Sequence, residues 1–344
     1  MRSVAPEHAP VCQNDKLNVF ALAGGFVKIG SNEMSTYSRF LTGLIAAPHT
    51  AMNVDGSVNL GAIEKQAARL LADGVNGAFI CGSTGEGHSL STGERQQVAE
   101  RWREVIGSAP LKLIVHAGHN SIEEAKQLAA HARKIGADAV SVMSPCYFKP
   151  ATVEDLIDFC APIAANCADL PFYFYDIPVL TGVNLSMVEL LRKTDGHIPN
   201  LAGIKFTSTN LMSLQECLEF EDGRFNILFG CDEMLLSALA LGVPGAVGST
   251  YNYCAPLYYK IIAAHAAGDT EAAQALQMKS VKLVQVLMQH GVLAAGKALM
   301  SLVGAECGPV RPPLRRLTEE QKTRLFRQVE ALGILEPVTA ARVH

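Results

Sequence analysis

The stretch Leu201-Ala-Gly-Ile-Lys-Phe-Thr-Ser208 decides how this chain is interpreted, because it is typical of a short buried β-strand with one lysine in its middle. Alternate residues of a strand face the same side, so Lys205 and Thr207 share one face while Ile204 and Phe206 share the other. An isolated buried ammonium group is costly, so this lysine either has a partner or stays neutral. A neutral lysine in a dry pocket can form a Schiff base with a carbonyl substrate. A lysine that extends to water is the alternative, and this strand alone does not separate the two.

Apolar runs and helical periodicity alternate on both sides of this stretch. Eight short apolar runs are typical of buried strands: Leu41–Ala47, Gly77–Gly82, Leu111–His116, Ala137–Met143, Phe172–Asp176, Leu201–Phe206, Phe225–Phe229 and Gly245–Gly248. Helical periodicity separates them at Leu60–Ala72, Thr92–Ile106, Ile122–Ile135, Val153–Ala165, Leu185–Lys193, Asn210–Phe220 and Glu233–Leu241. This alternation predicts an α/β fold, a closed parallel (β/α)8 TIM barrel. An open doubly wound sheet is the alternative, but no Gly-x-Gly-x-x-Gly follows the first strand.

The predicted barrel occupies residues 38–265. Residues 1–37 show no sustained period, so we expect a poorly ordered N-terminal extension outside the fold, within which Met34 offers another translation start. Residues 266–335 form a predicted C-terminal helical appendage, and residues 336–344 a short tail. The three helices expected in the appendage are Thr270–His290, Ala294–Val303 and Thr318–Leu332.

Composition excludes several classes of protein. Half of the residues (49%) are hydrophobic and 18% are charged, which supplies a large core. The net charge is −4 and no long basic block occurs, so neither nucleic acid nor an anionic membrane is an expected partner. We find no membrane-spanning run and no secretory signal, and the nine scattered cysteines contain no Cys-x-x-Cys pair. A cytoplasmic protein with reduced thiols and no metal site is therefore expected.

Unusual residues lie at four predicted strand ends, where the functional side chains of such barrels gather. The turn Cys81–Glu86 contains two glycines, and its backbone N–H groups can bind a carboxylate; a plain loop is the alternative. Tyr175 ends the strand beside that of Lys205, and paired strands lie only about 4.8 Å apart, so its hydroxyl can reach the lysine. A core aromatic is the alternative there. Gly230–Glu233 and Gly248–Asn252 place further polar groups at the same rim.

Four motifs together resemble the N-acetylneuraminate lyase and dihydrodipicolinate synthase family of pyruvate aldolases. They are Gly82-Ser-Thr-Gly-Glu86, Tyr175-Asp-Ile-Pro178, Gly203-Ile-Lys-Phe-Thr207 and Gly248-Ser-Thr-Tyr-Asn252. The resemblance extends from about Phe40 to Leu335. It implies a carbon–carbon lyase of the class I aldolase type, which acts through a covalent Schiff base on Lys205 and needs neither a metal nor an organic cofactor.

The resemblance also implies a role for each matching residue. Lys205 would attack the keto group of pyruvate or sialic acid, Ser83 and Thr84 would hold the carboxylate, and Tyr175 would shuttle protons. Tyr147 matches a tyrosine that family members insert into a neighbouring subunit, so a homo-oligomer, a homotetramer, is implied. The residues expected to bind sugar hydroxyls are Thr207, Gly230, Asp232, Glu233 and Ser249.

One departure from the family pattern bears on the substrate. Dihydrodipicolinate synthases carry an arginine for a second carboxylate two residues after Pro178, where this chain has Leu180. An apolar side chain cannot form a charge-assisted fork, so aspartate semialdehyde is disfavoured. The segments Phe172–Gly182 and Gly230–Asn252 are most similar to the lyase branch, which implies cleavage of N-acetylneuraminate to pyruvate and N-acetylmannosamine.

Three alternatives to this substrate and activity stay open. The first is a related aldolase for another 2-keto-3-deoxy sugar acid, and the second is a condensation like that of dihydrodipicolinate synthase. The third is a non-catalytic barrel that binds sugar acids, which the presence of both Lys205 and Tyr175 disfavours because a pure binding protein needs no nucleophile and no proton shuttle.

Overall fold

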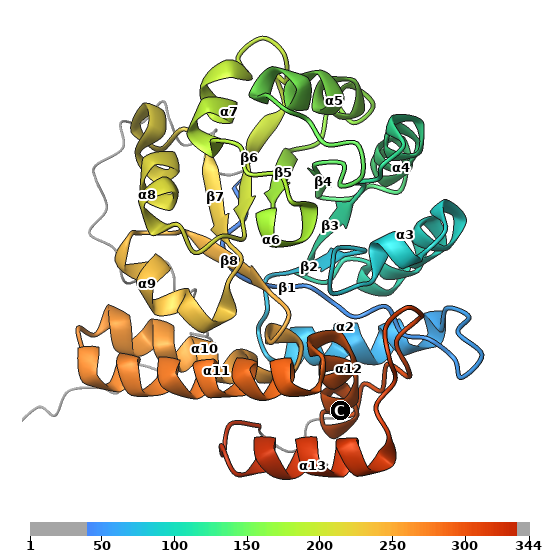
Figure 1. The fold of residues 1–344 in the computed structure, drawn as a ribbon, viewed down its shortest axis with the longest axis vertical. Helices are drawn as coiled ribbons and strands as arrows, with labels where there is room; N and C mark the ends of the chain where they lie inside the picture. Colours follow the sequence, from blue (N-terminus) through green and yellow to red (C-terminus); the bar gives the residue numbers. More distant parts are fainter. Residues whose placement is uncertain (1–39, 336–344) are drawn as a thin grey trace, which may run out of the picture.

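The structure, a computed structural model, describes residues 40–335, so the predicted N-terminal extension and tail lie outside the described residues. Eight parallel strands close into one barrel in chain order, with β1 paired to both β2 and β8 (Figure 1). The predicted TIM barrel is therefore confirmed. The strands are β1 (Gly43–Ala46), β2 (Gly77–Ile80), β3 (Lys112–His116), β4 (Ala139–Met143), β5 (Phe172–Asp176), β6 (Leu201–Phe206), β7 (Asn226–Phe229) and β8 (Gly245–Gly248).

Each strand is short and buried on both faces, which explains why the sequence shows continuous apolar runs instead of alternation. The two faces contribute to two separate apolar cores. Side chains such as Ile45, Phe79 and Tyr175 fill the interior of the barrel, whereas Leu44, Ile204 and Phe206 pack outward against the helices. The strand period of two thus sends Lys205 inward and its apolar neighbours outward.

Helices surround the strands, and α10 to α13 lie along the lower edge in Figure 1. Ser91, Ser121 and Thr152 cap the helices α3, α4 and α5, since each side chain accepts a hydrogen bond from the backbone N–H three residues on. The barrel helices are η2 (Leu60–Ala62), α2 (Ile63–Ala72), η3 (Gly87–Ser89), α3 (Thr92–Ile106), α4 (Ile122–Lys134), α5 (Val153–Ala165), α6 (Pro178–Thr181), α7 (Met187–Lys193), α8 (Leu211–Glu219), η4 (Phe220–Gly223), η5 (Asp232–Met234) and α9 (Leu235–Ala240).

Helix α10 (Tyr251–Ala266) is the main element that the sequence pattern did not predict. Pro256 lies inside it and Cys254 has non-helical dihedral angles, which hides its period. Because α10 begins at Tyr251, the end of the motif Gly248–Asn252 belongs to the first turn of a helix and not to a rim loop. Asn252 is buried there and donates to the carbonyl oxygens of Ala47 and Ser249.

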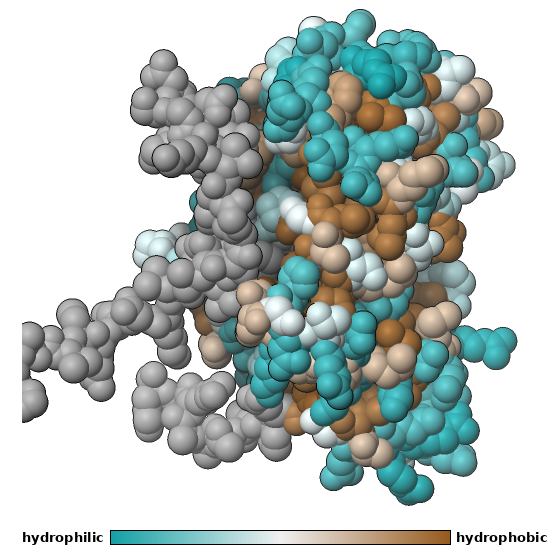
Figure 2. All heavy atoms as spheres, turned by 90° about the vertical axis from the view of Figure 1, so that its left-hand side faces the viewer, coloured by the Kyte–Doolittle hydropathy of each residue, from teal (hydrophilic) through white to brown (hydrophobic). Residues whose placement is uncertain are grey.

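Three helices follow the barrel: α11 (Thr270–His290), α12 (Val292–Leu302) and α13 (Glu319–Glu330). They match the helices predicted for the C-terminal appendage, and α11 packs along α10. Within residues 40–335 no single helix is long and apolar enough to cross a membrane; α11 and α12 reach that length and apolarity only together, as a pair bent by 115°. Figure 2 shows the side of the molecule seen at the left of Figure 1, where apolar residues appear between hydrophilic ones.

Candidate active site

Lys205 lies inside the barrel on β6, where 4% of its surface is exposed. Its Nζ is 4.0 Å from the centre of the Phe79 ring and 3.9 Å from that of Tyr175. It forms no ion pair with any described residue. Burial lowers the pKa of this amine to about 7, against the smaller opposing effect of the Asp232 carboxylate. A substantial neutral fraction at physiological pH makes Lys205 a competent nucleophile.

Tyr175 stands directly beside the lysine. β5 and β6 are neighbours as predicted, and their register pairs Tyr175 with Lys205. The tyrosine Oη lies 3.4 Å from Oγ of Ser83, which follows β2 on another side of the barrel. Burial raises the pKa of Tyr175 to about 12, and the Ser83 hydroxyl opposes this shift. Tyr175 is therefore a protonated phenol in the free protein, connected to a second hydroxyl.

Tyr173, two residues earlier on the same face of β5, lies deeper in the barrel. Its Oη donates to Oδ1 of Asn226 at 2.8 Å. Tyr173 is thus a core aromatic residue whose hydroxyl has a hydrogen-bond partner. From the sequence alone, this same role was the alternative left open for Tyr175.

His116 is a site neighbour that sequence reasoning missed. The ring packs on Phe79 (centroids 5.8 Å apart) and edge-on against Tyr175 (5.6 Å), and neither ring nitrogen has a hydrogen-bond partner in the described structure. Burial and the positive charge of Arg95 hold the histidine pKa well below its usual range, so the ring is neutral. Its position at the end of β3 on the inward face was the signal available in the sequence.

The turn after β2 brings Ser83 and Thr84 to the carboxyl end of the barrel. Both residues are half-buried. Close packing of the backbone forces glycine at position 87, because a Cβ there would lie 1.8 Å from the carbonyl oxygen of Cys81. The turn leads first into η3 and then into α3, which begins at Thr92.

Asp232 is the most deeply placed of the residues expected to bind sugar hydroxyls. Its Oδ2 accepts from the backbone N–H (2.9 Å) and the hydroxyl (2.6 Å) of Thr250, whereas Oδ1 has no partner in the described structure. A Cβ at Gly248 would lie 1.8 Å from that oxygen, so glycine is required at this end of β8. Burial raises the pKa of Asp232 to about 6, which leaves it mainly ionised at neutral pH. A carboxylate oxygen without a partner suits a hydroxyl donor.

The other predicted sugar-binding residues line the same rim. Thr207 follows β6 on the lysine face, and its buried hydroxyl has no partner among residues 40–335. Gly230 packs against that hydroxyl, since a Cβ at this position would clash with it. Glu233 and Ser249 are half-buried at the ends of β7 and β8. The tertiary structure thus gathers these residues at one end of the barrel.

Tyr147 does not join this group in the described structure. Its side chain is 76% exposed, and the one ring it contacts in the described structure is that of Phe148, itself 85% exposed. Val179 and Leu180, on the short helix α6, are also exposed at 82% and 60%. Leu180 thus presents an apolar side chain, and no charge, at the rim.

Two observations define what else the described structure contains. No group of three or more His, Cys, Asp or Glu side chains in residues 40–335 is placed to hold a metal ion. A cavity of about 730 Å³ lies at the opposite end of the barrel, where residues such as Leu41, Lys112 and Asp138 line it. It contains none of the predicted site residues, which lie at the carboxyl ends of the strands instead.

Comparison with known proteins gives a consistent result. Residues 40–332 match the Dihydrodipicolinate synthetase family. The N-acetylneuraminate lyase of Rattus norvegicus is 38% identical over 299 residues, which cover 86% of this chain and 93% of the relative. The solved structure of Proteus mirabilis N-acetylneuraminate lyase is 42% identical with a TM-score of 0.84, covering 86% of this chain and 100% of that one. N-acetylneuraminate lyase (sialic acid aldolase) from Aliivibrio salmonicida is 43% identical with the same TM-score, covering 86% and 98%.

The buried amine predicts a pH-dependent stability. The pKa of Lys205 is about 7 in the folded protein and near its ordinary value of 10.5 in the unfolded chain. Between these values the unfolded state binds more protons, so the free energy of unfolding rises with pH there, and the cost of burial is complete below about pH 7. We expect Lys205→Met to raise the free energy of unfolding, and Tm with it, most near pH 6, where the free-energy gain should be a few kcal/mol. The difference should fade towards pH 10.

Thermal unfolding of both proteins across this pH range measures the effect. Lys65→Met, which removes an exposed lysine from α2, is the control and should show no such pH dependence. A Lys205→Met protein less stable than wild type near pH 6 would contradict the assigned burial cost.

Proposed function

Because this chain belongs to the Dihydrodipicolinate synthetase family, we propose that it is a Schiff-base lyase that cleaves N-acetylneuraminate to pyruvate and N-acetylmannosamine. The match of residues 40–332 to this family confirms the resemblance that four motifs indicated in the sequence. The observation that carries the chemical proposal is the pair formed by Lys205 and Tyr175 on adjacent strands. One is a buried amine with a pKa of about 7, and the other a phenol beside it.

The first step is the attack of neutral Lys205 on C2 of the open-chain keto acid. Tyr175 gives its phenol proton to the hydroxyl of the resulting carbinolamine, which leaves as water, so that an iminium ion forms on Nζ and Tyr175 becomes a phenolate. The half-buried Ser83 and Thr84, with the backbone N–H groups of their turn, would hold the adjacent carboxylate. The Ser83 hydroxyl is already within 3.4 Å of the Tyr175 hydroxyl, so the carboxylate pocket and the proton shuttle are neighbours.

The second step is cleavage of the C3–C4 bond. The iminium withdraws the bonding electrons, while Tyr175 takes the proton of the C4 hydroxyl as the aldehyde leaves. The phenol pKa of about 12 disfavours a phenolate in the free protein. A positive iminium less than 4 Å from the ring, where Nζ now lies, would stabilise the phenolate at this moment. Protonation of the remaining enamine and hydrolysis of the imine release pyruvate and free Lys205.

The sugar end of the substrate would extend towards β7 and β8. Oδ1 of Asp232 and the hydroxyl of Thr207 have no hydrogen-bond partner among residues 40–335, which supports hydrogen bonds from both to substrate hydroxyls. Glu233, Ser249 and the backbone at Gly230 complete the proposed set. This arrangement also suits a related 2-keto-3-deoxy sugar acid, which remains the alternative within the same chemistry.

A neighbouring subunit is part of the proposal. The exposed rings of Tyr147 and Phe148 are large apolar groups without cover in the described chain. We place the Tyr147 ring at the site of an adjacent subunit, as the family resemblance implies, in a homotetramer. The cytoplasmic location stays a prediction.

Borohydride trapping tests the mechanism directly. With pyruvate present, reduction should inactivate the enzyme irreversibly and leave a pyruvyl adduct on Lys205, because the imine is reduced in place. Lys205→Arg should fold but form no adduct, since a guanidinium stays protonated. Peptide mass mapping locates the adduct, and borohydride without pyruvate is the control. An adduct on another lysine would overturn the assignment of the nucleophile.

Tyr175→Phe keeps the ring that packs against Lys205 and removes the hydroxyl. General acid–base groups typically contribute about 10²–10⁴-fold, so we expect kcat for cleavage to fall within that range while pyruvate trapping partly survives. Tyr173→Phe, which removes the neighbouring hydroxyl bonded to Asn226, is the matched control and should affect stability more than kcat. An undiminished kcat in Tyr175→Phe would show that another group moves the proton.

Leu180 provides the test of substrate choice. Wild type should cleave N-acetylneuraminate and turn over pyruvate with aspartate semialdehyde poorly. Leu180→Arg should improve the second reaction and weaken the first, because a guanidinium can pair with a substrate carboxylate but replaces an apolar contact. Val179→Arg, a charge on the adjacent and more exposed residue, is the control. If wild type condenses aspartate semialdehyde faster than it cleaves N-acetylneuraminate, the substrate assignment is wrong.

A further inference from the structure

The turn that carries Ser83 and Thr84 is fastened by a buried carboxylate at its end. Glu86 has left-handed dihedral angles (φ 52°), an uncommon conformation that persists only where surrounding contacts hold it. Its Oε1 lies 2.6 Å from Nζ of Lys297, and both side chains are 1% exposed. Its Oε2 accepts from the backbone N–H of Arg311 at 2.9 Å. Both partners come from the C-terminal appendage and not from the barrel.

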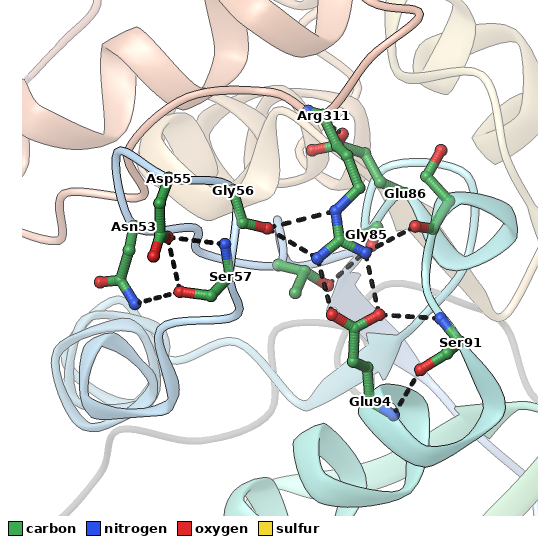
Figure 3. Close-up of polar contacts among 11 residues, drawn as sticks. Asn53, Asp55, Gly56, Ser57, Gly85, Glu86, Ser91, Glu94 and Arg311 are labelled. Atoms are coloured by element: carbon green, nitrogen blue, oxygen red, sulfur yellow. Dashed lines mark hydrogen bonds and ion pairs between the residues drawn. The ribbon is translucent and has the colours of Figure 1, made fainter.

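Arg311 fastens the segments on either side of the turn. Its guanidinium forms a two-pronged pair with the carboxylate of Glu94, at 2.7 and 2.9 Å, and donates to the carbonyl oxygens of Gly56 and Ser89 (Figure 3). Glu94 also belongs to the capping box of α3 with Ser91. One side chain of the appendage therefore joins the loop after β1, the end of η3 and the start of α3.

Helix α12 reaches the same turn by close packing. A Cβ at Gly296 would lie 2.7 Å from Nε2 of His49, so the backbone of α12 rests on this buried ring. The next residue of the helix is Lys297, whose Nζ also donates to the carbonyl oxygen of Pro309 at 2.8 Å. From the barrel side, the hydroxyl of Thr50 donates to the carbonyl oxygen of Gly85 at 2.7 Å. The turn is thus held between β1 and the appendage.

Other charges near Lys297 do not satisfy its ammonium group. His49 has a pKa lowered to about 3 by burial and by the charge of Lys297, so it is neutral at physiological pH. Burial lowers the pKa of Lys297 and the carboxylate of Glu86 opposes that effect. Arg311 pairs with Glu94 rather than with the lysine. Glu86 is therefore the charge partner that allows a cation to be buried here.

We infer that Glu86, Lys297 and Arg311 are positioning residues that set the geometry of the substrate-carboxylate pocket, so that the C-terminal appendage is a working part of the active site. This rests on the proposed function, in which Ser83 and Thr84 bind the carboxylate. The three residues act through the turn and do not touch the substrate. Their loss should weaken recognition of the carboxylate more than it slows chemistry at Lys205.

The experiment measures borohydride inactivation as a function of pyruvate concentration, in wild type, Lys297→Met and Arg311→Gln. We expect the half-saturating pyruvate concentration to rise by roughly ten- to a hundredfold, since small misplacements of binding groups have effects up to this size. The inactivation rate at saturation should change much less. Methyl pyruvate lacks the carboxylate charge, so its half-saturating concentration should barely respond. Lys297→Arg keeps a cation and should restore most of the affinity for pyruvate.

Leu325→Ala separates positioning from general stability. It removes a fully buried side chain from α13, which supplies none of the contacts to the turn described above, and should lower Tm without raising the half-saturating concentration. Arg311 is less buried than Lys297, so Arg311→Gln provides the same comparison if Lys297→Met does not fold. A folded Lys297 or Arg311 variant whose half-saturating pyruvate concentration equals that of wild type would overturn this inference and leave the proposed function intact. Absence of any pyruvyl adduct in wild type would overturn the proposed function, and this inference with it.

Discussion

The desolvation of one ammonium group by a closed barrel is the constraint on which the site depends. A barrel of eight strands has an interior that side chains fill, so a lysine on its inner face loses water without gaining a carboxylate at contact distance. Here the ammonium of Lys205 meets the faces of Phe79 and Tyr175, which stabilise a cation only weakly compared with an ion pair. Burial lowers its pKa to about 7, so a substantial fraction of this amine is neutral at physiological pH.

The same closure explains how distant segments become one site. Parallel pairing in chain order brings the carboxyl ends of all eight strands to one rim, so that β2, β5, β6, β7 and β8 each contribute at least one residue of the proposed site. The pairing register then selects which residues are neighbours, as it does for Tyr175 and Lys205. Two tyrosines on one face of β5 consequently differ: Tyr173 completes the core, whereas Tyr175 borders the reactive amine.

The appendage adds a second kind of constraint. A turn rich in glycine has many conformations available, and its hydroxyl groups bind a carboxylate well only if the turn is held in one of them. The buried pair of Glu86 and Lys297 resists other arrangements, because moving either residue alone would leave a charge unpaired in an apolar interior. A family barrel that carries extra helices in this way can use them to fix a loop as well as to cover apolar surface.

The sequence by itself determined the barrel and much of its rim. Continuous apolar runs separated by helical periods predicted all eight strands, and the strand period of two placed Lys205 on the face opposite to Ile204 and Phe206, because both follow from local periodicity. The helix α10 escaped because Pro256 and Cys254 interrupt its period. Only the tertiary structure placed His116 against Tyr175. It also joined Glu86 to Lys297 and Arg311, which each lie more than 200 positions further along the chain. Contacts across such separations leave no local pattern, since they depend on how strands and helices pack. The burial of Lys205 likewise depends on the tertiary structure, because it requires the closing of the whole barrel.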